Sequence, residues 1–384
     1  MDHQFLRITC FFLFMSSTIV AQNKLVVHSN PFHFEASYVG DALANFSGGL
    51  HEGATYLGMA NFRLSFDTEI AGFWKGGLFY IDAANTHGGK PSDKLIGDFQ
   101  IASNIEAGNL TYVHEFWFSQ KIGKGSTIFG VQDLNAQFAS SDLAGNFLNS
   151  SFGVHSTISN NIPSPIFPLT ALGWQLQYEF SAKLNGKVAV FDGLPEGYKH
   201  NNHHLSWKLD PDEGYLLISE FSYKSSVFDH RPGTYKIGAY YHNHYDLKNT
   251  TDSISVKNHE NYGGYMVADQ VVYASPNGGE LALFAQASIS PKSKNTNSDY
   301  LGLGLNYKGL FNTRMDDIFG LAMARAGFKN SIFSNETTLE LTYKSQLTQF
   351  LFVQPDFQYI IHPAGTDEII DNAFVGLIRV GLNF

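Results

Sequence analysis

Apolar and polar residues alternate with a period of two along many stretches of the chain, and the pattern is clearest in the segment 372–384. One face of that segment carries Phe374, Ile378, Val380, Leu382 and Phe384, and the other carries Ala373, Arg379, Gly381 and Asn383. Such a strand buries its apolar face against a second sheet in a soluble sandwich, or against lipid in a transmembrane barrel with a polar lumen. We expect its free edge to pair with the first strand, which would close a barrel.

The same alternation recurs upstream and predicts about sixteen strands, an even number as in bacterial outer-membrane barrels. The predicted strands are 32–48, 54–67, 77–88, 110–122, 126–140, 171–181, 187–194, 215–225, 234–247, 263–274, 281–290, 300–311, 318–328, 336–348, 350–362 and 372–384. Short turns alternate with longer polar segments, which include 89–109, a segment ending near 168, 198–213, 248–262 and 292–299. We therefore predict an all-β, transmembrane antiparallel barrel, formed as one domain by residues 22–384.

The two faces of the predicted strands 110–122 and 126–140 are assigned as follows. In 110–122, the apolar face is predicted to hold Tyr112, Phe116 and Phe118, opposite Thr111, Glu115 and Ser119. In 126–140, the residues that share one face are Phe129, Val131, Asp133, Asn135 and Gln137. Either a bulge shifts the register of the strand 126–140, or the lower half of this strand faces the lumen and is apolar.

The N-terminal segment 1–21 has the features of a secretory signal peptide. Arg7 supplies a positive charge, 8–15 form a short apolar core, and 16–21 lead to a small residue. Cys10 is the only cysteine and lies within this segment. We therefore expect an exported protein whose mature chain has neither disulfides nor thiolate chemistry.

Composition favours a membrane barrel over a soluble β protein of similar size. The chain has 33 Phe, 19 Tyr and 36 Gly, and only 16% of its residues are charged. Lipid-facing and lumen-facing positions that alternate would give this combination of many aromatic residues and few charges. The formal net charge of −10 argues against a nucleic-acid partner.

Several segments resemble one known family, the carbohydrate-selective outer-membrane porins (the OprB-like family). The resemblance is carried, in order, by 77–82 with 86–89, 96–107, 115–117, 130–138, 167–173, 264–265 with 269–270, 307–310 with Arg314 and Asp317, 340–343 and 354–363. It implies a sixteen-stranded barrel in a Gram-negative outer membrane, passive diffusion of sugars past loops folded into the lumen, and neither a cofactor nor a chemical step. The chain departs from the arginine-rich constriction expected of this family, because its mature part is poor in arginine.

Candidate pore-lining residues come from the polar faces of the strands and from the loop 97–107. Arg63, Arg325 and Arg379 are predicted to face the lumen, with Glu115 and Glu340 as their ion-pair partners and with Arg63 near Arg379. These pairs either line the sugar path or only stabilise the wall.

The remaining candidates are polar and aromatic. They are Asp98, Gln100 and Asn104 in the loop, Asp133 and Asn135 further along the chain, and Trp117, which either stacks on sugar rings in the lumen or belongs to an interfacial aromatic belt. His242 and His244 share a strand face, but no third ligand is evident, so we assign no metal site. No ordered nucleophile, histidine and acid mark a catalytic site.

The sequence therefore predicts an outer-membrane porin for mono- or disaccharides. The alternatives are a general porin without sugar selectivity and a non-conducting barrel that serves as an adhesin or surface enzyme. Expected partners are sugars, outer-membrane lipid and the barrel-assembly machinery during insertion. The protein is expected to act as a monomer or a homotrimer.

Overall fold

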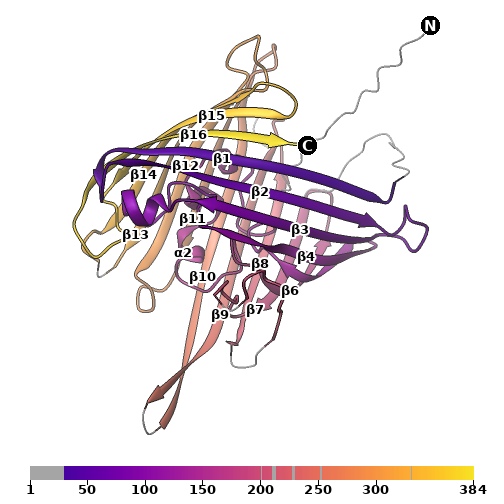
Figure 1. Cartoon of the computed structure of the whole chain (residues 1–384). Helices are drawn as coiled ribbons and strands as arrows, with labels where there is room; N and C mark the ends of the chain where they lie inside the picture. The colour runs from indigo at the N-terminus through magenta and orange to yellow at the C-terminus, as the bar shows by residue number, and fades with distance from the viewer. Residues whose placement is uncertain (1–29, 200, 210–212, 227–229, 251–252, 330) are drawn as a thin grey trace.

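A computed structural model describes residues 30–384 apart from 200, 210–212, 227–229, 251–252 and 330. Sixteen strands in this part of the chain form one closed antiparallel barrel, in which each strand pairs with its neighbours in sequence (Figure 1). The strands are β1 (Phe32–Gly49), β2 (Gly53–Asp67), β3 (Gly77–Gly88), β4 (Leu110–Ile122), β5 (Gly125–Gln132), β6 (Ala171–Glu179), β7 (Leu184–Asp192), β8 (Tyr215–Ser225), β9 (Gly233–Thr250), β10 (Ser253–Ala274), β11 (Glu280–Ile289), β12 (Asn297–Lys308), β13 (Ile318–Phe328), β14 (Asn335–Gln346), β15 (Leu351–Ile361) and β16 (Asp371–Asn383). The predicted fold class and strand number are confirmed.

The barrel closes where the last strand pairs with the first. β16 runs antiparallel to β1, with Arg379 opposite Asp41 and Ile378 opposite Ala42. The backbone N–H of Ala36 donates to the carbonyl of Phe384 at 3.1 Å, so the pairing continues to the C-terminal residue. Closure gives every strand two neighbours and leaves no unpaired edge in the hydrocarbon region.

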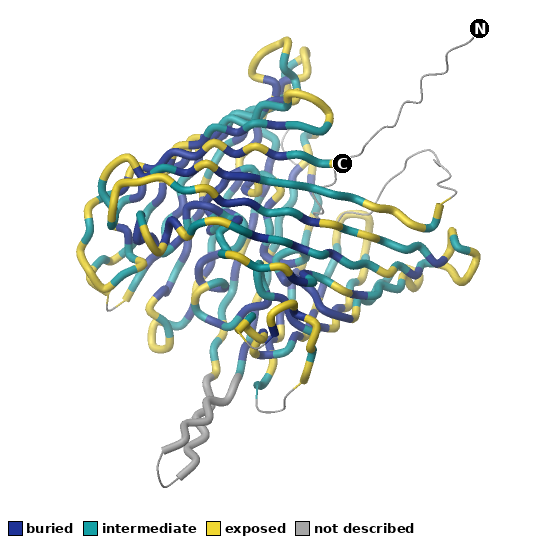
Figure 2. Tube along the Cα trace, viewed as in Figure 1, coloured by how far each residue is buried: buried dark blue, intermediate teal, exposed yellow. Residues whose placement is uncertain are grey.

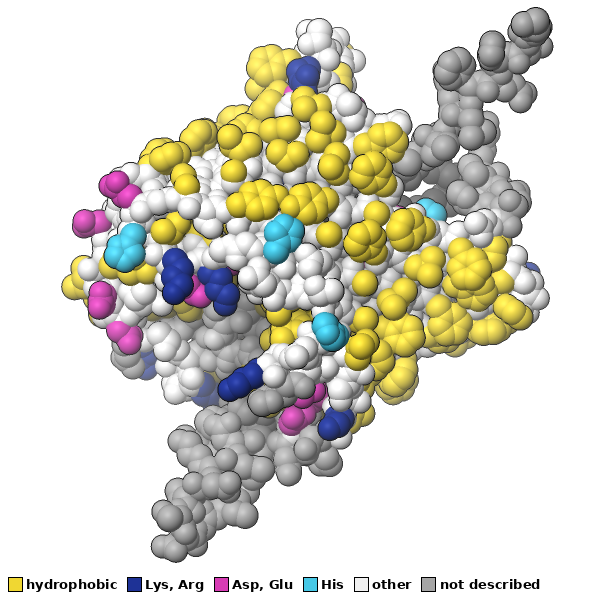
Figure 3. Space-filling view, in the orientation of Figure 1, with side chains coloured by type: hydrophobic (Ala, Val, Ile, Leu, Met, Phe, Trp, Pro, Cys, Tyr) yellow, Lys and Arg dark blue, Asp and Glu magenta, His cyan; other side chains and the backbone are white. Residues whose placement is uncertain are grey.

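Exposed or half-buried positions alternate with buried positions along the strands (Figure 2), and the exposed positions are largely apolar. Phe34 and Ile378 face outward and are 62% and 54% exposed, whereas Asp41 and Arg379 face inward and are 0% and 8% exposed. Hydrophobic side chains cover the outer surface over β1–β4 in Figure 3. No helix among the described residues is long and apolar enough to cross a membrane.

Two long loops, 89–109 and 133–170, fold into the barrel and fill part of its interior. The first contains the helical turn η1 (Ser92–Ile96), and the second contains η2 (Ala144–Asn146), α1 (Ser150–Gly153) and α2 (Ser156–Ser159). Apolar residues of loop 133–170 pack against the inner faces of β7–β10, and a second group packs against β11–β13. Loop 89–109 packs against β1, β2, β15 and β16. The interior is therefore a packed core on one side and a lumen on the other.

Three predictions about the strands need correction. The strand predicted at 126–140 ends at Gln132, so neither proposed register applies, and the residues from Asp133 onward belong to loop 133–170. A bulge between Asp82 and Ala83 of β3 and the facing part of β4 turns Tyr112 to the inner face, opposite Ala84. The inserted residue reverses the alternation, which explains why Phe116 still faces outward.

The polar segment predicted as a loop at 248–262 instead continues the hairpin of β9 and β10, which projects beyond the barrel (Figure 1). Beyond the membrane both faces of a strand meet water. Inter-strand hydrogen bonds can then hold the hairpin without any apolar alternation, which is why the pattern gave no sign of it.

We predict that Ile378→Lys, which places a charge on the outer face near the middle of β16, lowers the free energy of unfolding by about 2–4 kcal/mol. The measurement is urea unfolding in lipid vesicles, followed by the gel shift of the folded barrel. Ser119→Lys is the control, because Ser119 lies on the lumen face of β4. Equal losses in the two variants would contradict the assigned faces.

Candidate pore constriction

Loop 89–109 is held against the wall by the carboxylate of Glu336, which lies on the inner face of β14 and is fully buried. This carboxylate accepts the backbone N–H groups of Phe99 at 2.7 Å, Gln100 at 2.9 Å and Ala364 at 2.7 Å. The two oxygens of a carboxyl group can accept several hydrogen bonds, and backbone N–H groups buried away from water need such partners. Glu336 therefore joins the inward loop to the segment between β15 and β16.

Loop 133–170 is held in the same way by Glu340, which lies four residues after Glu336 on the same inner face of β14. Its carboxylate accepts the N–H groups of Leu148 at 2.5 Å and Asn149 at 3.1 Å. Two amide side chains of β15 complete the attachment. Gln354 donates to the carbonyl of Asn146 at 2.7 Å, and Gln358 donates to a carbonyl of the other loop at 2.8 Å.

The opposite wall repeats this arrangement with Glu220 on β8 and Asp269 on β10. Glu220 accepts the N–H of Ala139 at 2.9 Å and forms an ion pair with Lys187 at 3.1 Å. Asp269 accepts the hydroxyl of Ser141 at 2.5 Å and the N–H of the next residue at 3.0 Å. Loop 133–170 is thus attached to both sides of the barrel, which fixes where it narrows the lumen.

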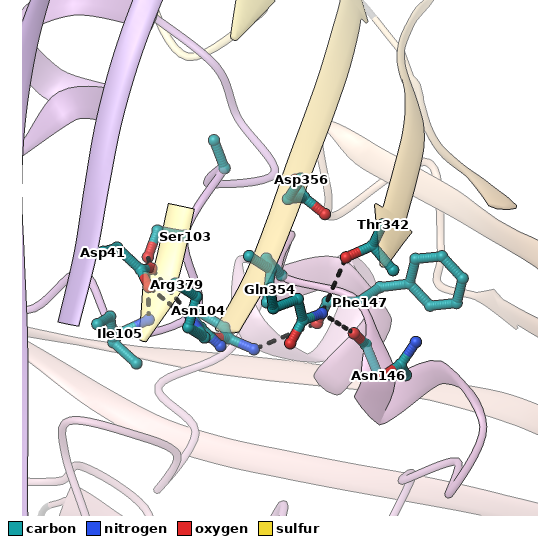
Figure 4. A network of polar contacts seen from close by, with 12 residues as sticks. Asp41, Ser103, Asn104, Ile105, Asn146, Phe147, Thr342, Gln354, Asp356 and Arg379 are labelled. Carbon is teal, nitrogen blue, oxygen red and sulfur yellow. Dashed lines mark hydrogen bonds and ion pairs between the residues drawn. The ribbon is translucent and has the colours of Figure 1, made fainter. Parts of the chain in front are cut away.

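Arg379 connects the barrel seam to loop 89–109 (Figure 4). Its guanidinium forms two hydrogen bonds with Asp41 across the β1–β16 pair, at 2.7 and 2.8 Å. It also donates to the amide oxygen of Asn104 at 2.7 Å, and Ser103 donates to the same Asp41 at 2.7 Å. Because Arg379 and Asp41 are both buried, this network holds the loop at the seam.

A second charged group lies on the inner face of β2–β4. Arg63 pairs with Asp82 at 3.3 Å, and 31% of its side chain is exposed. Asn61 donates to both oxygens of Asp82 at 3.1 Å. Glu115 accepts the N–H of Asp133 at 3.1 Å, at the start of loop 133–170.

Next to this group, Tyr80 and Trp117 form a stacked pair on the inner face of β3 and β4. Their ring centroids are 4.7 Å apart and their planes differ by 20°. The register pairs the two residues directly and places them one step along from Asp82 and Glu115. Trp117 therefore lies on the lumen side, not in an aromatic belt at the lipid interface.

The prediction that Arg325 faces the lumen is wrong. Arg325 shares the outer face of β13 with Leu321, which is 47% exposed, and it forms a 2.8 Å ion pair with Asp299 of β12. The inner face carries Ala322 and Ala324, whose small side chains leave room for the aromatic residues of loop 133–170. The pattern led to the wrong face for Arg325 because the inner face of β13 is not polar. Its alanines pack against a loop inside the barrel instead of lining water.

The predicted ion pairs also differ from those in the structure. The arginines pair with Asp41, Asp82 and Asp299, while Glu115 and Glu340 accept backbone N–H groups instead. Arg63 and Arg379 are not neighbours. Their cross-strand partners on β1, Glu35 and Asp41, are separated along one strand by roughly 20 Å.

The other predicted residues lie in the inward loops, where most of them hold the loop together. Gln100 and Asp98 are buried, and Asn104 contacts Arg379. Asn135 donates its side-chain amide to the carbonyl of Gly153 at 2.9 Å, and its own N–H donates to Asp133 at 2.8 Å.

The sequence reasoning missed the acceptors Asp41, Asp82, Glu220, Asp269 and Glu336. Each lies on the polar face of a predicted strand, and this was the signal available.

The histidines form no evident metal site. His242 is buried, with Nε2 2.6 Å from the carbonyl oxygen of Gly193, and the side chain of His244 lies outside the described ones. Among the side chains that the structure describes, no group of three or more His, Cys, Asp or Glu residues is placed to hold a metal ion.

A closed barrel of sixteen strands with loops folded into its lumen has the architecture of an outer-membrane porin. A family model described as carbohydrate-selective porin, OprB family, matches residues 51–384. The chain therefore belongs to this family, and both family and fold indicate an outer-membrane channel, not an enzyme.

Two relatives are porins, and a solved structure shares the fold. Porin B of Pseudomonas aeruginosa is 25% identical over 91% of this chain and 87% of its own length, and the putative porin QuiX of Acinetobacter baylyi is 23% identical over 92% and 89%. The high-pH structure of Pseudomonas putida OprB has the same fold, with a TM-score of 0.82 and 23% identity over 92% of this chain and 94% of that one.

We predict that Glu336→Gln raises single-channel conductance, because an uncharged amide cannot accept three backbone N–H groups as a carboxylate does and loop 89–109 then leaves the wall more often. The measurement is conductance in a planar bilayer with symmetrical salt. Glu179→Gln, on the inner face of β6, is the control. An unchanged conductance would show that Glu336 does not control the lumen.

The attachment of loop 89–109 is also expected to depend on pH. Burial raises the pKa of Glu106 to about 7, and it raises the pKa of Asp98 to about 6. Because the folded loop then binds more protons than the unfolded loop between about pH 4 and 7, its stability rises as the pH falls through that window.

Hydrogen exchange of the loop amides, corrected for the intrinsic effect of pH, should therefore be slower at pH 5.5 than at pH 8. Glu106→Gln should reduce the difference, whereas Glu52→Gln, at an exposed position between β1 and β2, should preserve it. Faster corrected exchange at the lower pH would refute the prediction.

Proposed function

We propose that neutral mono- and disaccharides cross this barrel by passive diffusion and pause at a binding site on the inner face of β2–β4. The site consists of the stacked rings of Tyr80 and Trp117 beside the charged groups of Arg63, Asp82 and Glu115. The stacked aromatic pair on the inner face, beside the partly exposed Arg63, is the observation that carries the proposal.

The chemistry of this site suits a sugar. One side of a sugar ring is a sheet of C–H groups, which packs on an aromatic face, and its edge carries hydroxyls that both donate and accept hydrogen bonds. Arg63 provides donors, while Asp82 and Glu115 provide acceptors. Because Arg63 is paired with Asp82 at 3.3 Å, these two residues offer both donors and acceptors without a net charge of their own.

Passage also requires that the solute leave the site. Arg63 remains partly exposed, and a hydrated, partly open site binds more weakly than an enclosed one. The attached loops 89–109 and 133–170 set the space opposite the rings. Transport then needs neither a cofactor nor a conformational cycle.

Three features from the sequence stay predictions beside this proposal. They are the signal peptide at 1–21, which lies outside the described residues, insertion by the barrel-assembly machinery, and action as a monomer or a homotrimer.

The test is ion current through single channels titrated with glucose, maltose and a neutral non-sugar of similar size. We expect both sugars to block the current in a saturable way and the non-sugar to leave it unblocked. Trp117→Leu should weaken the block by roughly three- to tenfold, since it removes one aromatic contact.

Trp174→Leu is the matched control, because Trp174 lies on the outer face of β6 and is 52% exposed. A current that no sugar blocks would indicate a general porin. Equal effects of the two tryptophan variants would place the sugar elsewhere in the lumen.

A further inference from the structure

The outer wall over β5–β12 is hollowed by two apolar grooves, each of about 450 Å³. The first lies over β5–β8 and is lined by Leu176, Tyr178, Phe180 and Val188 among others. The second lies over β7–β12, with Ile237, Met266, Ala268, Ala285, Ala287 and Leu301 among its lining residues. Phe221 of β8 borders both grooves, so they form one continuous surface.

The grooves arise where small side chains lie between large ones. Gly186 adjoins the rings of Phe180 and Phe221, and a Cβ at that position would come within 2.8 and 3.0 Å of them. In the second groove, Ala268 and Ala285 are cross-strand partners, which deepens the surface between the flanking large residues. A groove floored by small residues and bounded by aromatic rings has the apolar chemistry to hold an extended hydrocarbon chain.

The first groove runs to the end of the barrel that carries the short turns, which is the periplasmic end in outer-membrane barrels. Gly125 follows the turn between β4 and β5, and Phe180 begins the turn between β6 and β7. Each turn carries an exposed lysine, Lys124 and Lys183. Neither lysine has an ion-pair partner among the described residues.

Two other basic residues at this end of the barrel are paired with acids. Lys308 lies 3.6 Å from Asp316, and Arg314 pairs with Asp317, both beside the turn between β12 and β13. The strand ends of β4–β8 combine four lysines, at 121, 124, 183 and 224, with the single acid Glu179 among the described residues. Unpaired positive charge is therefore concentrated at the periplasmic end of the first groove.

We propose that this surface is a binding site for an anionic phospholipid of the periplasmic leaflet. Its acyl chains would lie in the two grooves on either side of Phe221, and its phosphate would contact Lys124 and Lys183. Apolar grooves alone would hold any hydrocarbon chain, whereas the unpaired lysines at their open end select a negatively charged headgroup. The site is separate from the lumen, because these grooves lie on the opposite side of the wall.

The test is native mass spectrometry of the folded full-length barrel, released from detergent after titration with phosphatidylglycerol or with phosphatidylcholine of identical acyl chains. We expect phosphatidylglycerol to remain bound and phosphatidylcholine to dissociate. Lys124→Gln combined with Lys183→Gln should weaken phosphatidylglycerol binding by about thirtyfold, the loss expected when two lysines near the membrane surface lose an anionic partner.

Two further variants complete the design. Lys75→Gln combined with Lys308→Gln removes two lysines that lie at the same end of the barrel but outside the strand ends of β4–β8, and should leave binding unchanged. Ala268→Leu combined with Ala287→Leu fills the second groove and should abolish retention while both headgroup lysines are intact. The gel shift of the folded barrel verifies folding of each variant.

Equal retention of the two phospholipids, or equal effects of the two lysine pairs, would overturn the proposed headgroup site. Retention in the groove-filled variant would overturn the acyl-chain site. A lipid-free oligomer whose mass is insensitive to the lysines would assign the surface to a second copy of the chain.

Discussion

The structure depends on one constraint, which is that a backbone N–H group away from water must find an acceptor. In the wall, strand pairing meets this requirement only if the sheet closes, and the contact of β1 with β16 closes it. Inside the barrel the same requirement returns, because two loops bring irregular backbone into a narrow space. There the acceptors are side chains of the wall, with Glu336 and Glu340 on one side and Glu220 and Asp269 on the other. Barrel closure thus supplies acceptors for the N–H groups of the wall, and the inner carboxyl groups supply acceptors for the N–H groups of the loops.

Much of the fold was predictable because lipid imposes a strict alternation on the strands that cross it. The alternation is absent where strands leave the membrane, as in the projecting part of β9 and β10, and where the chain leaves the wall beyond Gln132. It is interrupted where a bulge inserts a residue, as beside Tyr112. The candidate site was less predictable. A polar residue on an inner face is compatible with lining water, pairing with another charge or accepting a loop, and only the position of the loop decides among them. Glu340 and Arg325 were misassigned for this reason, whereas the sequence left Trp117 between the lumen and the lipid interface, and its inner face in the structure decides between the two.

The interior is divided between support and passage. Loop 133–170 occupies the side of β7–β13, where apolar contacts and buried acceptors hold it. The side of β2–β4 retains partly exposed Arg63 and the stacked rings of Tyr80 and Trp117. A rigid support on one side and an amphipathic surface on the other give a passage whose shape does not depend on the solute. The outer wall shows a comparable division, with a ridge at Phe221 between two hollows.

The way in which the wall holds the loops has a consequence for divergence within such barrels. Glu336 and Glu340 contact main-chain N–H groups, which every residue except proline possesses, and so they place almost no demand on the identity of the loop side chains. A substitution in either loop can then alter the diameter or the polarity of the passage without loosening its attachment. The wall and the loop attachments can therefore stay constant while single substitutions in the loops change the solute preference. Each such change can occur without the loss of the fold.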